Sequence, residues 1–271
     1  MIRKLIKHEA LRTGPKAGTI LGIFTLVVLL CGVFARFNFP MISAFVGQVG
    51  TIAIVSAWPV INVLLAIDFW RTSWGRVGYL THSLPVKGST ILWVRLLWGA
   101  ACQVIAFAWT ALALLGSMYL SNPSFQGGNL PINGTVLLLF VGALFIGWFW
   151  LVQFYFAVTI GNGPRLAALG AAGPIITWVV VSVVFAIVAC IMILLVPLGL
   201  DLAGGDVSLQ IVDIGTLAAR YQAESMVGGS NMTMNKNAAV MPFGWVFAPV
   251  ALIVVCLPWM LRNWNRRISL R

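Results

Sequence analysis

Six long apolar runs are the feature that most constrains how this chain can fold. Each run reaches the length of about 20 residues that an α-helix needs to cross a bilayer. Backbone N–H and C=O groups must pair internally in lipid, and the runs do not alternate in polarity, so helices are favoured over a β-barrel. We therefore predict an all-α, polytopic membrane protein with six transmembrane helices in a single domain, residues 1–271. The runs cover residues 17–35, 43–67, 91–119, 135–160, 167–199 and 243–261.

The composition agrees with a bilayer as the solvent. Apolar residues make up 61% of the chain and charged residues only 8%, which is too little polar surface for a soluble domain of this size. The net charge of +11 would suit a nucleic-acid-binding protein. The cations, however, stand at the ends of the runs and in short loops, where membrane orientation and anionic membrane lipid explain them. We therefore expect contact with membrane lipid and no nucleic-acid partner.

Charge is divided unequally between the two sides of the six runs. If both termini lie on one side, fourteen of the seventeen Lys and Arg residues fall there, and four of the six acidic residues fall on the other side. The positive-inside rule makes the first side the cytoplasm, so we expect both termini to be cytoplasmic. The fourteen cations are Arg3, Lys4, Lys7, Arg12, Lys16, Arg71, Arg76, Lys87, Arg95, Arg165, Arg262, Arg266, Arg267 and Arg271.

Two segments outside the runs have helical patterns of their own. Residues 1–16 place apolar and basic side chains on different faces ahead of Gly14-Pro15, which favours a short interfacial helix on the cytoplasmic surface. Glu9 falls on the apolar face, so a plain basic flank is the alternative. The largest external segment is residues 201–242. There, apolar residues recur at helical spacing from Val207 to Tyr221, so we expect one or two short external helices before the sixth span.

Enzymatic chemistry is not indicated by the polar residues. Catalytic and metal sites need convergent nucleophiles, bases or ligands, but the only histidines are His8 and His82, and all four cysteines lie inside the runs. We therefore expect no catalytic, cofactor-binding or metal site in this chain. Asp68 stands at the end of a run near Arg71, which indicates a surface ion pair or a helix-end role rather than a proton path.

Nucleotide hydrolysis by this chain is also excluded on sequence grounds. A Walker A phosphate loop requires Gly-Lys followed by Ser or Thr. None of the five lysines stands in that context, because the residues that precede them are Arg, Ile, Pro, Val and Asn rather than Gly. If the protein uses ATP, a separate subunit must therefore bind and hydrolyse it.

The loop between the second and third runs, residues 68–89, contains the most specific motif. Aromatic residues alternate with cations there, and Ser89 or Thr90 is suited to cap the next helix. With its basic start and six runs, the chain resembles permease subunits of bacterial ATP-binding-cassette (ABC) transporters of the exporter type, which have a similar segment in this loop. The matching residues, in the order Gly-x-x-Gly-Tyr-Leu-x-x-Ser-Leu-Pro-Val, are Gly75, Gly78, Tyr79, Leu80, Ser83, Leu84, Pro85 and Val86.

The resemblance implies a division of work between subunits. Residues 69–84 would form a coupling helix that docks on cytoplasmic ABC ATPase subunits, which would hold the ATP and Mg, while a second permease copy or a related permease completes the path. Many relatives carry Asp-Glu where this chain has Arg76-Val77, which changes the electrostatics of docking. The residues to which the resemblance assigns coupling are Phe69, Trp70, Arg71, Trp74, Gly75, Gly78, Tyr79, Leu80, Ser83, Leu84 and Pro85.

Physical reasoning alone leaves the role of these aromatic residues open. Aromatic and Arg side chains dominate protein contacts, but Trp and Tyr also settle at membrane interfaces without any partner. In the fourth run, Trp148, Gln153 and Tyr155 belong to an aromatic cluster that could line a substrate path, although packing against helices or lipid explains such residues better.

Taken together, these patterns predict a permease subunit in the bacterial cytoplasmic membrane that exports an amphiphilic or hydrophobic substrate such as a peptide, drug or lipid. The alternative is a nonenzymatic membrane immunity or binding protein that acts without an ATPase. An ion-coupled carrier is a third reading, disfavoured because no carboxylate lies at mid-span.

Overall fold

Six long helices make up most of the computed structural model. They are α1 (Ile2–Ala35), α2 (Pro40–Ser73), α4 (Gly88–Ser121), α5 (Gly134–Gly161), α6 (Ala172–Leu195) and α8 (Phe247–Arg266). Each is long and apolar enough to cross a membrane, so the prediction of six helices of membrane-spanning length is confirmed. The structure describes residues 2–35, 40–75, 78, 86–121, 134–163, 166–196, 198–201, 208–211 and 240–266.

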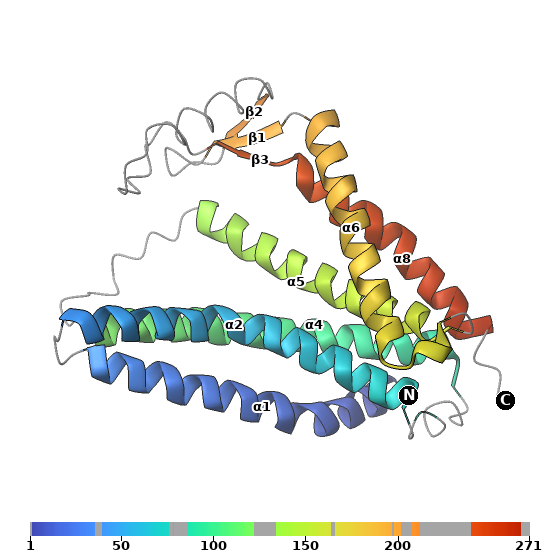
Figure 1. Ribbon diagram of the computed structural model, residues 1–271, viewed down its shortest axis with the longest axis horizontal. Helices are drawn as coiled ribbons and strands as arrows, with labels where there is room; N and C mark the ends of the chain where they lie inside the picture. The colour runs from blue at the N-terminus through green and yellow to red at the C-terminus, as the bar shows by residue number, and fades with distance from the viewer. Residues whose placement is uncertain are drawn as a thin grey trace.

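The helices form two groups that are joined by α5. In Figure 1, α1, α2 and α4 run alongside one another, and all three pairs are in contact. The helices α6 and α8 pack on each other and on α5, which also contacts α2 and α4. The two groups approach at the end where α1 begins, α2 ends, α4 begins and α8 ends, and they diverge toward the opposite end. We call the end at which the two groups approach each other the loop end.

Apolar packing is concentrated between the helices near the loop end. The main core cluster includes Leu65 of α2, Leu96 of α4, Leu151 of α5 and Met260 of α8, each at most 2% exposed. Many apolar side chains of α6 are instead exposed, as expected for a helix whose surroundings are lipid. The helix surface is therefore divided between a small protein core and a broad apolar exterior.

The first helix differs from the prediction of a separate interfacial segment. The break predicted at Gly14-Pro15 is wrong, because α1 continues from Ile2 through Pro15 to Ala35. Proline removes one backbone hydrogen bond from a helix interior. Buried contacts made by Glu9 and Thr13 hold the turns before Pro15 against the other helices. Residues 2–16 are thus the first turns of the same helix.

A small antiparallel sheet follows α6 at the end opposite the loop end (Figure 1). Its strands are β1 (Leu198–Asp201), β2 (Ser208–Ile211) and β3 (Val240–Pro242), in the order β2-β1-β3. Leu198 pairs with Ile211, and Leu200 pairs with Met241.

The sheet corrects the helix predicted from Val207 onward. That helix is wrong over residues 208–211, where polar and apolar side chains alternate as in a strand and β1 provides an edge for pairing. The remainder of that helix, residues 212–221, lies outside the described residues. Two 3₁₀ helices, η2 (Ala167–Leu169) and η3 (Gly244–Val246), precede α6 and α8, so the fifth span begins later than residue 167.

Candidate functional site: a buried charge cluster beneath the loop

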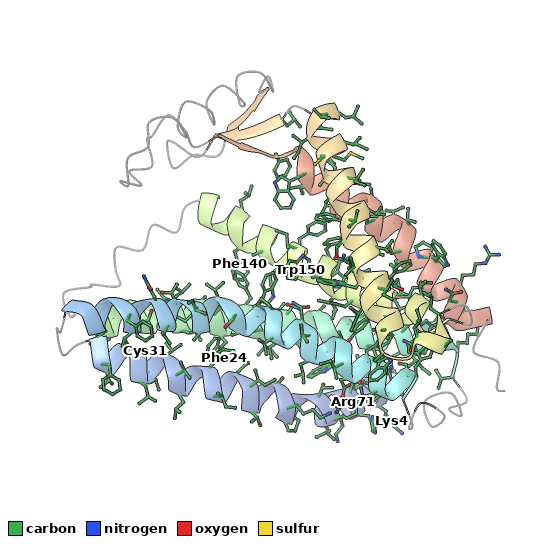
Figure 2. The ribbon with its side chains drawn as sticks, in the orientation of Figure 1. Lys4, Phe24, Cys31, Arg71, Phe140 and Trp150 are labelled. Carbon is green, nitrogen blue, oxygen red and sulfur yellow. The ribbon has the colours of Figure 1, made fainter. Side chains whose placement is uncertain are left out.

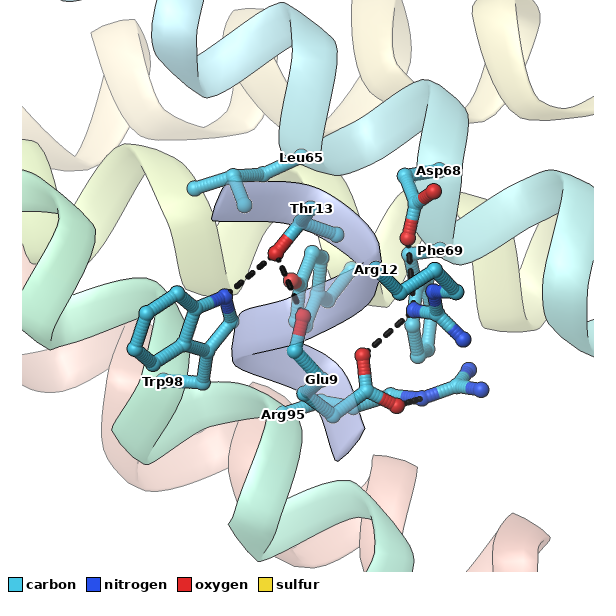
Figure 3. Close-up of a pocket in the computed structure, with 9 residues that line it drawn as sticks. Glu9, Arg12, Thr13, Leu65, Asp68, Phe69, Arg95 and Trp98 are labelled. Carbon is cyan, nitrogen blue, oxygen red and sulfur yellow. Dashed lines mark hydrogen bonds and ion pairs between the residues drawn. The ribbon is translucent and has the colours of Figure 1, made fainter. Parts of the chain in front are cut away.

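Three helices bring five charged side chains together at the loop end. Their spacing on α1 is three to four residues, which places the three α1 side chains on one helix face. Figure 3 shows four of them converging beside Phe69 and Trp98. The five residues, which we call the charge cluster, are Glu9, Arg12 and Lys16 of α1, Asp68 of α2 and Arg95 of α4.

Each carboxylate of the charge cluster contacts two cations. The Nη2 atom of Arg12 donates to Glu9 Oε2 and also to Asp68 Oδ2, at 2.6 Å from the latter. Lys16 Nζ donates to Asp68 Oδ1 at 3.1 Å, and Arg95 Nε donates to Glu9 Oε1 at 3.3 Å. These are charge-assisted hydrogen bonds, which are stronger than neutral ones. With three cations and two carboxylates, the cluster has a formal charge of +1.

Burial across the cluster is graded. The side chain of Arg95 is 3% exposed and that of Asp68 is 7% exposed, whereas Lys16 is 52% exposed. A buried charge is tolerated only when it is paired and hydrogen-bonded. Arg95 and Asp68 therefore depend on their partners, while Lys16 is solvated from outside.

Arg95 also reaches the point at which the chain leaves α2. Its Nη1 atom donates to the hydroxyl oxygen of Ser73, the last residue of α2. Its guanidinium lies 5.3 Å from the centre of the Phe69 ring, within the range of a cation–π contact. One side chain of α4 thus contacts both α1 and the start of the loop.

The other end of the loop is attached to α8. The backbone N–H of Ser89 donates to Asn265 Oδ1 at 3.2 Å. The backbone at Gly88 approaches α8 so closely that an added Cβ would lie 2.6 Å from Trp264 O. The prediction that Ser89 or Thr90 caps this helix is wrong, because α4 already begins at Gly88 and a side chain of α8 supplies the acceptor.

A cavity of about 10 Å³ lies inside the charge cluster, which is room for about one water molecule. Thr13 and Trp98 border it together with Leu65, Phe69 and Tyr155. Thr13 Oγ1 accepts from Trp98 Nε1 at 2.5 Å and donates to Glu9 O at 2.9 Å (Figure 3). The hydrogen bond from Trp98 to Thr13 therefore reinforces the contact between α1 and α4.

Aromatic rings adjoin the charge cluster and join α2, α5 and α8. The rings of Phe69 and Tyr155 are stacked, with their centroids 4.1 Å apart. Trp264 lies 5.8 Å from Phe69 and 5.5 Å from Trp74. Such stacked and edge-to-face pairs add stability beyond the area they bury. The two helix groups are therefore packed together beside the charge cluster.

The residues predicted to couple to an ATPase are divided between the interior and the surface. Phe69 is 1% exposed and faces the core, and Trp70 is half-buried and donates to Asn162 Oδ1 at 3.2 Å. Arg71 is exposed and, like Lys4, carries its charge at the loop end (Figure 2). Trp74 lies in the aromatic group, Gly75 is half-buried and Gly78 is buried. Tyr79, Leu80, Ser83, Leu84 and Pro85 lie outside the described residues.

The predicted loop boundaries and the pairing of Asp68 also need correction. The helix α2 continues to Ser73, so the loop does not begin at Asp68. Asp68 pairs with Arg12 and Lys16 of α1, not with Arg71. Because the side chain of Arg71 is exposed while Asp68 is buried, the neighbouring helix supplies the countercharges.

The three residues proposed to line a substrate path do not converge. Gln153 is buried and donates to Ser182 Oγ at 2.8 Å, which links α5 to α6. Tyr155 borders the cavity of the charge cluster, and Trp148 packs against the main core. Residues two positions apart do not share a helix face, so Gln153 and Tyr155 point into different contacts.

A second polar network, not anticipated from the sequence, lies deeper between α2 and α4. Trp58 Nε1 donates to Gln103 Oε1, and Gln103 Nε2 donates to Asn62 Oδ1. Asn62 is fully buried and Gln103 is 2% exposed. Amides inside spanning helices require partners of this kind. The presence of Asn62 in the second apolar run and of Gln103 in the third is the sequence feature from which their pairing could have been predicted.

Features of the sequence could also have predicted the charge cluster. Arg95 stands inside the third apolar run, and a cation there requires a partner. Glu9, Arg12 and Lys16 recur at helical spacing, which indicates a shared face. Among the residues that the structure describes, no group of three or more His, Cys, Asp or Glu could hold a metal ion.

Comparisons of the chain with protein-family models, curated proteins and solved structures find no match.

Proposed function

We propose that this chain is the permease subunit of an ABC exporter in a bacterial cytoplasmic membrane, with both termini cytoplasmic. A separate ATPase would dock on the loop between α2 and α4 and supply the ATP and Mg. A second copy or a related permease would complete the path for an amphiphilic or hydrophobic substrate. The proposal draws on the six spans and on the motif from Gly75 to Val86.

The observation that carries the proposal is the attachment of both loop ends to other helices. Arg95 holds Ser73 at one end, and Asn265 holds Ser89 at the other. A force applied to the loop would therefore act on α1 through Glu9 and on α8 through Asn265. Motion of packed helices as rigid bodies is an established means of switching.

Within the described part of the coupling segment, the surface available for docking is centred on Arg71 and the exposed part of Trp70. Phe69 would act from inside by supporting Arg95 and Tyr155. Arg and Trp are the side chains that most often dominate binding energy at interfaces. We thus assign docking to Arg71 and the exposed part of Trp70, and internal support to the buried Phe69.

Copurification tests the proposal directly. The full chain, tagged and extracted in a mild detergent, should co-migrate with a subunit that contains a Walker A sequence. Arg71→Glu should reduce the amount of that subunit at least tenfold, whereas Arg262→Glu, a change of another exposed cation outside the coupling segment, should reduce it less than twofold. Consistent absence of an ATPase from the purified wild type would instead favour the nonenzymatic binding or immunity protein.

A further inference from the structure

One buried cation joins three parts of the structure that a transporter would have to move together. Arg95 of α4 contacts Glu9 of α1, Ser73 at the end of α2 and the ring of Phe69. We propose that Arg95 is a positioning residue that clamps α1 to the loop-bearing ends of α2 and α4, so that these three helices move as one body. The link to transport rests on the proposed function, whereas the clamp itself does not.

The chemistry of Arg95 supports positioning rather than space filling. Burying a charge carries a large desolvation cost, and a well-packed apolar residue often fills such a site at least as stably. Arginine, however, offers five N–H donors in a rigid fork. Its Nε and Nη1 atoms contact acceptors on two different helices. A side chain that served only to fill the core would not need donors in two directions.

Two ion pairs that do not include Arg95 also connect α1 to α2. Arg12 of α1 donates to Asp68 of α2 at 2.6 Å, and Lys16 donates to the other oxygen of that carboxylate. Farther along the same two helices, a Cβ added to Gly50 of α2 would lie 3.3 Å from the Cβ of Cys31 of α1. The first helix is therefore close to α2 both at the charge cluster and near its opposite end.

The attachment of the loop to α8 provides a matched comparison. Asn265 accepts a hydrogen bond from the backbone N–H of Ser89, in the first turn of α4, and within the described residues it forms no hydrogen bond with α1. Removing Asn265 should loosen the same loop without loosening α1. Removing the guanidinium of Arg95 should loosen the loop and α1 together.

Hydrogen exchange on the purified full chain in lipid nanodiscs tests the clamp without any ATPase. Arg95→Gln should raise the exchange rate at least fivefold in peptides from residues 5–16 and also near Ser73. Asn265→Ala should raise it near Ser89 and leave residues 5–16 within twofold of wild type. Ser73→Ala, which removes one hydroxyl, should raise exchange near the loop with a smaller effect. Arg95→Lys keeps the charge but lacks the rigid fork of donors, so it should raise exchange in residues 5–16 by a smaller factor and keeps the test valid if Arg95→Gln does not fold. Unchanged exchange of residues 5–16 in Arg95→Gln, or in Arg95→Lys if Arg95→Gln does not fold, would overturn the proposal.

A cross-link tests whether α1 and α2 move as one body. Gly50→Cys places a thiol beside native Cys31, and the Cβ separation of 3.3 Å needs to increase by only a few tenths of an ångström to suit a disulfide. In the copurified complex, oxidation should leave the ATPase activity measured with Mg and ATP alone within twofold of the reduced sample. A loss of tenfold or more that reduction reverses would contradict the single body. If no ATPase copurifies, the transport proposal fails, while the exchange experiment still decides the clamp.

Discussion

Removal of the Glu9 carboxylate should destabilise the protein more than removal of any other single charge on α1. Glu9 contacts two guanidinium groups, and its side chain is 10% exposed. At the 3.3 Å separation from Arg95 Nε, with an effective dielectric constant of about 20, the attraction between unit charges is about 5 kcal/mol. Gln at this position keeps one acceptor oxygen but not the charge, so we expect Glu9→Gln to lower the free energy of unfolding by about 3 kcal/mol, within the range known for breaking buried pairs.

A double-mutant cycle separates this pair from its surroundings. Arg95→Met removes the buried cation, so in the double variant with Glu9→Gln no uncompensated charge is left at that point. The combined loss should therefore be smaller than the sum of the two single losses by about 2 kcal/mol. Lys16→Met is the control, because Lys16 is 52% exposed and a pair so exposed contributes about 1 kcal/mol or less.

Unfolding in mixed micelles, followed by circular dichroism as the fraction of denaturing detergent rises, would measure these differences. The cycle must be run at one ionic strength, because salt screens the exposed pair of Lys16 more than the buried pair of Glu9. Additive losses in the double variant, or equal losses for Glu9→Gln and Lys16→Met, would refute the assignment of Glu9 and Arg95 as a coupled buried pair.

Two further predictions use the same unfolding measurement. Gly147→Ala should cost about 1–3 kcal/mol because an added Cβ would overlap the indole of Trp58. Gly142 has open space around it, so Gly142→Ala should be neutral or stabilising by up to about 1 kcal/mol. Equal effects of the two changes would contradict the close packing of α5 on α2. Gln103→Leu should cost about 1–3 kcal/mol because it removes the donor to the buried Asn62 Oδ1 and the acceptor for the Trp58 indole N–H. A variant as stable as wild type would show that this network contributes little.

The spans could be predicted from the sequence because each depends on its own residues. An apolar run of sufficient length must satisfy its backbone hydrogen bonds internally wherever it stands, so composition alone identified all six helices. The Gly14-Pro15 break was mispredicted for the opposite reason. Local preference disfavours proline inside a helix, but Glu9 and Thr13 are held by side chains of other helices, and those contacts depend on residues more than eighty positions away.

Partners of charged groups were harder to predict than positions of helices. Asp68 has a cation three residues away in Arg71, which made a local ion pair the simplest expectation. The structure instead provides Arg12 and Lys16 from α1. Sequence spacing shows which face a side chain occupies but not which helix will pack there. The strand at Ser208–Ile211 was missed similarly, since its pairing depends on β1 as well as on its own alternation.

The cluster changes the meaning of the charge imbalance from which the topology was predicted. Of the fourteen cations assigned to the cytoplasmic side, Arg12, Lys16 and Arg95 are paired with the carboxylates of the charge cluster, and the other eleven lie outside that cluster. Glu9 and Asp68, the two acidic residues assigned to that side, are both neutralised within the cluster. Acidic residues contribute little to orientation in any case, so the eleven remaining cations still favour the same topology. The loop end therefore combines two uses of charge, since buried pairs fix the helices to one another while solvated cations such as Lys4 and Arg71 remain available to a partner or to anionic lipid.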